Sequence, residues 1–277
     1  MNAEKKIQKT DFLVIGSGIA GLSFAVKIAT NFKNSKVTIV TKNEKSESNT
    51  KYAQGGIATV WNKTVDSFEQ HINDTLIAGD GLCKNSIVKM VVENAPDRLQ
   101  ELINWGAKFD KTNNGNYSLG REGGHSQDRI LHHKDITGAE IERALIEQVE
   151  NAENIEFLSH HFAIDLITEH QVKRLETKRK EKISCFGAYV LDSKKNIVKT
   201  YSAKVTMLAS GGIGQVYSTT TNPTIATGDG IGMAYRAKAE ISDVEFIQFH
   251  PTALYNPGEY PAFLISEAVR GEGAILR

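Results

Sequence analysis

The sequence predicts an α/β fold of the doubly wound, Rossmann-like type, with a small antiparallel β layer added to it. Residues 11–15 are a short apolar run, which is typical of a buried strand. A glycine-rich turn at residues 16–21 follows, and residues 22–29 then carry apolar side chains at helical spacing. Residues 37–40 are a second β-branched run. Together these segments predict a βαβ unit of about 30 residues.

The remaining elements follow from the same patterns. Helices are expected at residues 87–105 and 137–149, the second with a capping box in which Thr137 is the N-cap and Glu140 its partner. Residues 245–250 resemble a buried strand, which His250 and Pro251 would end. Other strands are expected at 155–158, 163–168 and 205–209, and in the antiparallel layer at 185–191 and 198–203.

The composition is that of an ordinary globular protein, with 277 residues that are 40% hydrophobic and 24% charged. Lysine plus arginine number 33, as do aspartate plus glutamate, so bulk charge gives no argument for a nucleic-acid partner. The two cysteines, Cys83 and Cys185, exclude a disulfide framework and fit a reducing compartment. No signal peptide and no apolar run of about 18 residues is found, so a cytoplasmic location without a membrane partner is expected.

One charge-dense segment, residues 172–183, tests the exclusion of nucleic acid. It contains six basic residues, but Glu176 and Glu181 are interspersed and no aromatic side chains interleave. A nucleic-acid site would be expected to combine a cluster of basic side chains with interleaved aromatic ones. We therefore expect a solvated hairpin loop between two strands.

The first motif is the pattern GxGxxG, placed after a strand and at the start of a helix. The first glycine allows the tight turn, the second lets the backbone approach a pyrophosphate, and the third lets the helix pack closely. An acidic residue usually ends the second strand, but here Thr41 and Lys42 follow it. They would have to substitute, which argues against an ordinary NAD site, although Lys42 could equally be a surface residue. The motif consists of Gly16, Ser17, Gly18, Ile19, Ala20 and Gly21.

A second candidate is the segment "SNTKYAQGG", whose small residues could lie against a flat ligand. An ordinary loop is the alternative. The residues concerned are Ser48, Asn49, Thr50, Ala53, Gln54, Gly55 and Gly56.

A third candidate is the loop "REGGHSQDRILH", in which Glu122 could face a cationic group of a substrate. A solvated polar loop is the alternative. His132, His133 and Asp135 could suggest a metal, but their spacing is poor and carboxylates are sparse, so no metal is expected.

Two later segments complete the set of motifs. Residues 227–230 read Thr-Gly-Asp-Gly and open a helix, so Asp229 could receive a ribose or ribityl hydroxyl or could act as the helix N-cap. His250 and Thr252 stand at the end of the expected strand, and Ser266 follows. A lone histidine at a strand end is more often structural than functional.

Taken in order, GSGIAGL, SNTKYAQGG, TGDGIGMAYRAKA, QFHPT and SEAVRGEGAIL resemble the flavoprotein family of succinate dehydrogenase, fumarate reductase and L-aspartate oxidase. The resemblance covers residues 11–277. It implies an FAD-binding domain at residues 1–245 and the beginning of an inserted capping domain at 246–277. The cofactor-binding residues that it implies also include Ala163, Ser210 and Gly211.

Two details of the resemblance favour the aspartate oxidase branch. Asn49 occupies the position of a histidine that links covalently to the flavin in the dehydrogenases, so FAD is expected to bind non-covalently. "REGGHS" and "HPTALY" look like the aspartate oxidase versions, and Glu122 would then face the ammonium group of L-aspartate. Charge-assisted bonds to the substrate carboxylates would come from the other end of the site. The residues expected there are Gln248, His250, Thr252 and Ser266.

The resemblance implies the FAD-dependent oxidation of L-aspartate to iminoaspartate, with oxygen or fumarate as acceptor. This is the first step of de novo NAD biosynthesis through quinolinate, which makes quinolinate synthase a candidate partner. Family members run beyond Arg277, and the arginine expected to act in catalysis lies in that further part. We therefore expect an N-terminal fragment that is inactive alone. A soluble fumarate reductase or succinate dehydrogenase-type flavoprotein and a non-catalytic FAD-binding module stay open as alternatives.

Overall fold

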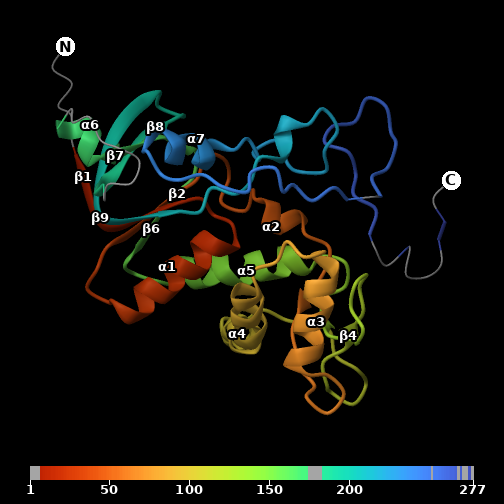
Figure 1. Ribbon diagram of the computed structural model, residues 1–277. Helices are drawn as coiled ribbons and strands as arrows, with labels where there is room; N and C mark the ends of the chain where they lie inside the picture. The colour runs from red at the N-terminus through yellow and green to blue at the C-terminus, as the bar shows by residue number, and fades with distance from the viewer. Residues whose placement is uncertain (1–6, 174–182, 251, 267–268, 270–273, 276–277) are drawn as a thin grey trace. The chain divides into compact units, whose positions relative to one another are not determined.

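The structure, a computed structural model, describes residues 7–173, 183–250, 252–266, 269, 274 and 275 (Figure 1). The chain divides into two units: unit 1 is Met1–Lys51 with Leu145–Phe263, and unit 2 is Tyr52–Ala144 with Leu264–Arg277. The expected start of a capping domain at residue 246 does not coincide with a boundary between these units, and it stays a prediction. Among the described helices, none combines the length and the apolar character needed to cross a membrane.

Unit 1 is built on a six-stranded mixed sheet (Figure 1). Its strands are β1 Gln8–Ile15, β2 Val37–Val40, β6 Ile155–Leu158, β7 His161–Thr168, β8 Cys185–Asp192 and β9 Ile197–Leu208. Their order is β6-β2-β1-β9-β8-β7. The first four run parallel, whereas β8 is antiparallel to both β9 and β7. The predicted antiparallel strands are thus the continuation of the same sheet.

Helices pack on both faces of this sheet, as expected for a doubly wound fold. Successive side chains of a strand point to opposite faces. Leu13 and Ile15 of β1 belong to the core cluster that contains Met233 of α7. Val14 points the other way, toward Gly21 of α1. The helices with residues in unit 1 are α1 Ile19–Asn31, α2 Asn49–Tyr52, α5 Thr137–Glu150, α6 Glu169–Lys173, the 3-10 helix η1 Gly214–Val216 and α7 Asp229–Arg236.

The two strands predicted at 198–203 and 205–209 are a single strand, β9. Lys204, which separated the two predictions, lies within this strand and points outward, where its Nζ pairs with Asp11 Oδ1 at 2.6 Å. The first half of β9 pairs with β8 and the second half with β1. A lysine on the solvent side does not interrupt the backbone ladder, so the pattern alone suggested a false break.

The predicted buried strand at 245–250 is wrong. Residues 246–250 belong to none of the described strands, and the side chains of Phe246 and Phe249 are 62% and 70% exposed. The ring of Phe249 lies against that of Tyr217, with 5.1 Å between centroids. A strand needs a neighbour for its backbone groups, and no described strand lies beside this segment. Pro251 lies outside the described residues.

The predicted capping box of α5 is also wrong, since the helix begins at Thr137 itself. The Thr137 hydroxyl accepts the backbone N–H of His133 at 2.9 Å. The Glu140 carboxylate accepts the N–H of Lys108 at 2.9 Å and pairs with Arg143 at 2.8 Å. The hydrogen bond from Arg143 comes first among the causes that lower the pKa of Glu140. Neither side chain therefore accepts the other residue's backbone N–H, as a capping box requires.

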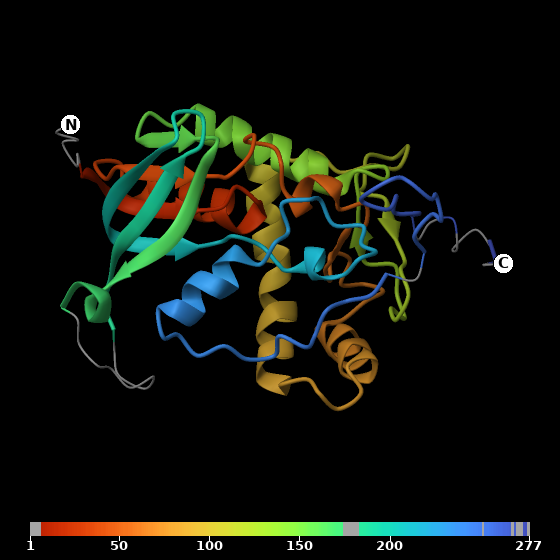
Figure 2. The same cartoon turned by 90° about the horizontal axis from the view of Figure 1, so that it is seen from above.

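Unit 2 combines two long helices with a small antiparallel sheet. Helix α3 begins at an N-cap, Ser67, whose hydroxyl accepts the N–H of Gln70 at 3.1 Å. Helix α4 buries an apolar stripe of Val88, Val92 and Leu99 and lies beside α3 (Figure 2). The bounds are α3 Phe68–Ala78, α4 Asn85–Asn104, β3 Ile57–Ala58, β4 Leu119–Gly120 and β5 Ile130–Leu131, with the sheet order β3-β5-β4.

The charge-dense segment lies between two paired strands, as the sequence predicted, but its first two residues, Val172 and Lys173, belong to helix α6 and not to a loop. β7 and β8 pair in antiparallel fashion on either side of it. Within the segment, residues 174–182 lie outside the described part of the chain.

Candidate functional site

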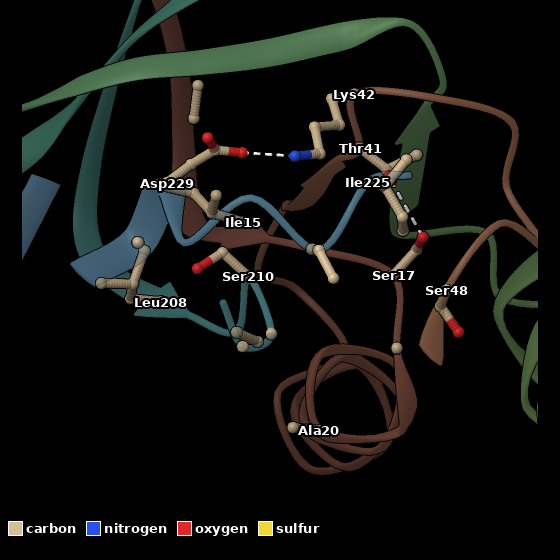
Figure 3. A pocket seen from close by; sticks show the side chains of 18 of the residues that line it. Ile15, Ser17, Ala20, Thr41, Lys42, Ser48, Leu208, Ser210, Ile225 and Asp229 are labelled. Carbon is tan, nitrogen blue, oxygen red and sulfur yellow. Dashed lines mark hydrogen bonds and ion pairs between the residues drawn. The ribbon is translucent and has the colours of Figure 1, made fainter. Parts of the chain in front are cut away.

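An open cavity of about 440 Å³ lies at the carboxyl ends of the parallel strands of unit 1 (Figure 3). The strand register aligns Ile15 of β1 with Val40 of β2 and with Leu208 of β9, and all three residues line the cavity. Ligands of open α/β sheets bind at this edge of the sheet. The cavity therefore has the location that the glycine motif predicts.

The glycine-rich turn is shaped by close packing. Gly16 has a φ of +112°, and a Cβ on it would stand 2.2 Å from the carbonyl oxygen of Ala209. A Cβ on Gly21 would stand 2.1 Å from the carbonyl oxygen of Gly16. These positions confirm the predicted turn and the close approach of helix to strand. Gly18 is less constrained, because its Cβ would stand 3.4 Å from Thr50 Oγ1.

The N-terminus of α1 forms one wall of the cavity. Gly18 is the N-cap of this 13-residue helix, and the first turn contains no acidic side chain. Ile19 donates its N–H to Thr50 Oγ1 at 3.0 Å, and Ser17 donates its hydroxyl to Thr41 Oγ1 at 3.0 Å. Gly18, Ile19 and the two hydroxyl partners all line the cavity. A helix N-terminus of this kind favours an anionic group such as a pyrophosphate.

An ion pair between Lys42 and Asp229 forms a second wall (Figure 3). Lys42 Nζ also donates to Thr227 Oγ1 at 2.6 Å, and Thr227 donates its hydroxyl to Asp229 at 2.9 Å. The side chains of Lys42 and Asp229 are each 24% exposed, so Lys42 is no ordinary surface lysine. The N-cap alternative for Asp229 is wrong, since the N-cap of α7 is Gly228, with a φ of +73°.

The cavity brings together most of the predicted cofactor-binding residues. The predicted residues that line it are Gly16, Ser17, Gly18, Ile19, Ala20, Lys42, Ser48, Asn49, Thr50, Ala163, Ser210, Gly211 and Asp229. Gly21 supports the turn from within α1.

Sequence reasoning missed several lining residues, among them Glu47, His161, Phe162 and Ile225. The predicted strand at 163–168 began two residues late, because β7 starts at His161. The backbone N–H of His161 donates to the carbonyl of Thr41 at 2.8 Å, which continues the pairing beyond β2. This extension brings the side chains of residues 161 and 162 to the cavity. Glu47 had no recognisable motif.

The residues present fit a dinucleotide. The α1 N-terminus can hold a pyrophosphate, and the Glu47 carboxylate, Lys42 and Asp229 offer partners for ribose or ribityl hydroxyls. Apolar side chains such as Phe162 and Ile225 can cover flat rings. The volume of about 440 Å³ lies in the usual range for ligand pockets.

The other predicted cofactor residues lie in unit 2 and have partners there. The carbonyl of Ala53 accepts the N–H of Gly138 at 2.9 Å, and Gln54 Nε2 donates to the carbonyl of Leu264 at 3.0 Å. Gln54 Oε1 is buried without a hydrogen-bond partner among the described residues. A Cβ on Gly56 would stand 2.3 Å from the carbonyl oxygen of Leu131. Packing against β5 therefore already requires a glycine at residue 56.

Glu122 lies against the paired glycines of the same unit. Its Oε1 accepts the N–H of Gly56 at 3.3 Å, and a Cβ on Gly55 would stand 3.1 Å from this oxygen. The solvated-loop alternative leaves this contact unexplained. One carboxylate of the loop thus has a defined position.

The expected substrate residues are divided between the two units. In unit 1, His250 Nδ1 lies 3.3 Å from the backbone nitrogen of Thr252 and 3.2 Å from its Oγ1, and Thr252 is buried. Gln248 is exposed. In unit 2, Ser266 donates its hydroxyl to Asp135 Oδ1 at 2.7 Å. Glu267, Arg270 and Glu272 of the last motif lie outside the described residues.

His132 and His133, at the end of the loop "REGGHSQDRILH", lie near the carboxylate of Asp110. Nδ1 of His132 lies 3.3 Å from Asp110 Oδ2, and Nδ1 of His133 lies 3.6 Å from Asp110 Oδ1. Nδ1 of His133 is nevertheless buried without a hydrogen-bond partner among the described residues. In the described part of the chain, no three histidine, cysteine or acidic side chains gather as metal ligands would.

Comparison with known proteins identifies similar chains. A family profile described as "FAD binding domain" matches residues 11–277. The chain is 48% identical over 274 residues to the chloroplastic L-aspartate oxidase of Oryza sativa subsp. japonica, covering 96% of this chain and 41% of that protein. It is 45% identical over 282 residues to the L-aspartate oxidase of Vibrio cholerae, covering 100% of this chain and 50% of that protein. The chain thus spans about half the length, or less, of these curated relatives.

A solved structure has the same fold. The chain is similar to a structure described as quinol-fumarate reductase with menaquinol molecules, with a TM-score of 0.86 and 31% sequence identity. The match covers 97% of this chain and 44% of that one. The α/β fold expected from the sequence is confirmed by this likeness together with the sheet of unit 1.

Proposed function

The chain belongs to the family of FAD binding domains, and from this premise we propose that it is the FAD-binding part of an L-aspartate oxidase. FAD is its cofactor. The cavity of unit 1 supports its place there, because a helix N-terminus, polar side chains and apolar side chains line it. The activity of the relatives is part of the proposal and not of the premise, because this chain spans only 41% and 50% of the length of two of them. The observation that carries it is an identity of 45% to 48% to proteins named L-aspartate oxidase.

The proposed reaction is the oxidation of L-aspartate to iminoaspartate. When bound, FAD supplies the hydride acceptor, and oxygen or fumarate reoxidises it. Glu122 binds the substrate ammonium group, which its carboxylate can do because it is already held at Gly56. Gln248, His250, Thr252 and Ser266 bind the carboxylates. Quinolinate synthase as partner and the cytoplasm as compartment complete the proposal, and the two free thiols support the latter.

The test of the proposal is the substitution Glu122→Gln in the FAD-loaded full-length protein, because this chain covers only 41% and 50% of the length of two relatives. Glutamine keeps the shape of the side chain but removes the charge, so the KM for L-aspartate should rise about tenfold or more. Binding of succinate, which lacks the ammonium group, should stay unchanged. Peroxide formation measures the oxidation, and Glu69→Gln on the exposed side of α3 is the matched control.

The same assays distinguish the alternatives. The likeness to quinol-fumarate reductase favours a fumarate reductase as the second candidate. Fumarate reduction faster than aspartate oxidation, with an unchanged KM in Glu122→Gln, would establish that candidate. A full-length protein that is yellow but forms no peroxide from L-aspartate would instead be a non-catalytic FAD-binding module.

A further inference from the structure

The loop that carries Glu122 is hydrogen-bonded to helix α3 at Asp74. Residues 122–125 form a turn in which His125 donates its N–H to the carbonyl of Glu122 at 3.3 Å. Gly124 within this turn has a φ of +84°, which favours glycine. Ser126 follows directly and donates both its N–H, at 2.9 Å, and its hydroxyl, at 2.8 Å, to Asp74 Oδ2. The turn at residues 122–125, which carries Glu122, is therefore anchored to Asp74 through the next residue, Ser126.

Arg129 reinforces the anchor from the other end of the loop. Its guanidinium is fully buried, and Nη1 donates to Asp74 Oδ2 at 2.6 Å. Nε and Nη2 each reach a carboxylate oxygen of Asp66 at 2.8 Å. Nη1 also lies 3.3 Å from His125 Nδ1. A buried guanidinium with bidentate pairing has a fixed orientation, so Arg129 holds Asp74 and the loop in one arrangement.

The charge state of Asp74 suits this role. Burial alone would raise the pKa of its carboxyl group, but the hydrogen bonds from Ser126 and Arg129 outweigh burial and hold the pKa below its ordinary value of 3.8. An ionised carboxylate accepts hydrogen bonds and donates none. Asp74 Oδ2 accordingly receives three donors from the loop and from Arg129.

We propose that Asp74 is a positioning residue for amino-group selectivity, because it fixes the turn that places the Glu122 carboxylate. This inference rests on the proposed function, in which Glu122 binds the ammonium group of the substrate. Asp74 lies on α3 and acts only through the loop. Its loss should loosen the turn and weaken binding of L-aspartate, while binding of succinate should remain.

The test compares Asp74→Asn with Asp80→Asn, an identical change at an exposed residue that follows α3. The amide introduced by Asp74→Asn keeps one oxygen that can face the donors of Ser126 and Arg129, but it removes the negative charge that strengthens these hydrogen bonds. Hydrogen exchange of the amides of residues 121–126 should become about tenfold faster, since a charge-assisted hydrogen bond is lost. Titration of the flavin spectrum gives the Kd for L-aspartate and for succinate. The preference for L-aspartate, which is the ratio of these two Kd values, should fall about tenfold. Ser126→Ala keeps both buried charges and should change exchange and selectivity in the same direction, so it provides the test if Asp74→Asn does not fold.

Each outcome decides the question. Faster exchange together with lost selectivity supports the inference, provided that Asp80→Asn changes neither. Unchanged exchange, or faster exchange with unchanged selectivity, overturns it. Glu122→Gln reports separately on the proposed function. If Glu122→Gln abolishes selectivity and Asp74→Asn does not, only the positioning role fails.

Discussion

At the scale of single residues, Gly21 shows how closely the cofactor turn is packed. A Cβ at residue 21 would stand 2.1 Å from the carbonyl oxygen of Gly16 and 3.2 Å from Val14 Cγ1. We expect Gly21→Ala to lower the free energy of unfolding by about 1–3 kcal/mol, as overpacking does. Urea unfolding measures the change, and Gly123→Ala, with no atom within 4 Å of its Cβ, is the control. Equal losses in the two variants would contradict the packing argument.

Two glycines of the motif could be predicted, because the positive φ of Gly16 and the close approach of Gly21 to Gly16 are local backbone requirements. Gly16 and Gly21 occupy the positions that the pattern GxGxxG requires. The pairing of Lys42 with Asp229 joins residues that are far apart in the sequence, so no local pattern indicates it. Sequence reasoning identified both residues as candidates but did not predict that they bind each other.

At the scale of elements, helix α3 carries a buried titratable group beside the loop that holds Glu122. His71 is buried, and its ring centroid lies 5.5 Å from that of His125. Burial, followed by the positive charge of Arg129, lowers the pKa of His71 below its ordinary value of 6.5. The folded state therefore takes up the proton at a lower pH than the unfolded state.

This depressed pKa predicts how stability depends on pH. Above the unfolded-state pKa of 6.5, His71 is neutral in both states, and its contribution to stability is fully present. As the pH falls from 6.5 through the folded-state pKa, the unfolded state binds the proton first, so the free energy of unfolding decreases. We expect His71→Gln to reduce this decrease. Urea midpoints measured from about pH 7.5 down to about pH 5 compare the two proteins. Parallel curves would show that another group is responsible.

Element prediction succeeded where the fold buries a strand or helix, on one face or on both. Residues 37–40 form β2 as predicted, and its four side chains are all buried. Residues 246–250 have a similar apolar content, but the chain offers them no described neighbouring strand. The alternation of residue types cannot reveal whether a partner strand exists, and this explains the error.

At the scale of the whole molecule, the order of the motifs identified the family, although each motif alone has an ordinary structural explanation. Gly56 illustrates this, because packing against Leu131 already requires it. The division into two units could not be predicted, since unit 1 is formed by two segments that are separated by 93 residues of unit 2, residues 52–144. Periodicity describes neighbours in sequence and carries no information about such a return of the chain.

Because unit 1 is formed by two separate segments of the chain, FAD should stabilise the unit by contacting both of them. The cavity is lined by residues from both segments of this unit, from Ile15 to Ile241. A ligand that binds only the folded state stabilises it by about 2.7 kcal/mol at one hundred times its Kd. We therefore expect FAD to raise the melting temperature and to slow hydrogen exchange in the segments that line the cavity. Riboflavin lacks the pyrophosphate that the α1 N-terminus would hold, so it should have a weaker effect.

We expect FAD to bind non-covalently, because of the residue at position 49. Asn49 lines the cavity and has no imidazole that could form a bond to the flavin. Acid precipitation of the FAD-loaded protein should therefore leave all of the flavin in the supernatant, with none in the pellet. Yellow colour retained in the pellet would contradict non-covalent binding. A melting temperature that FAD leaves unchanged would contradict the assignment of the cavity itself, because a ligand that binds the folded state must stabilise that state.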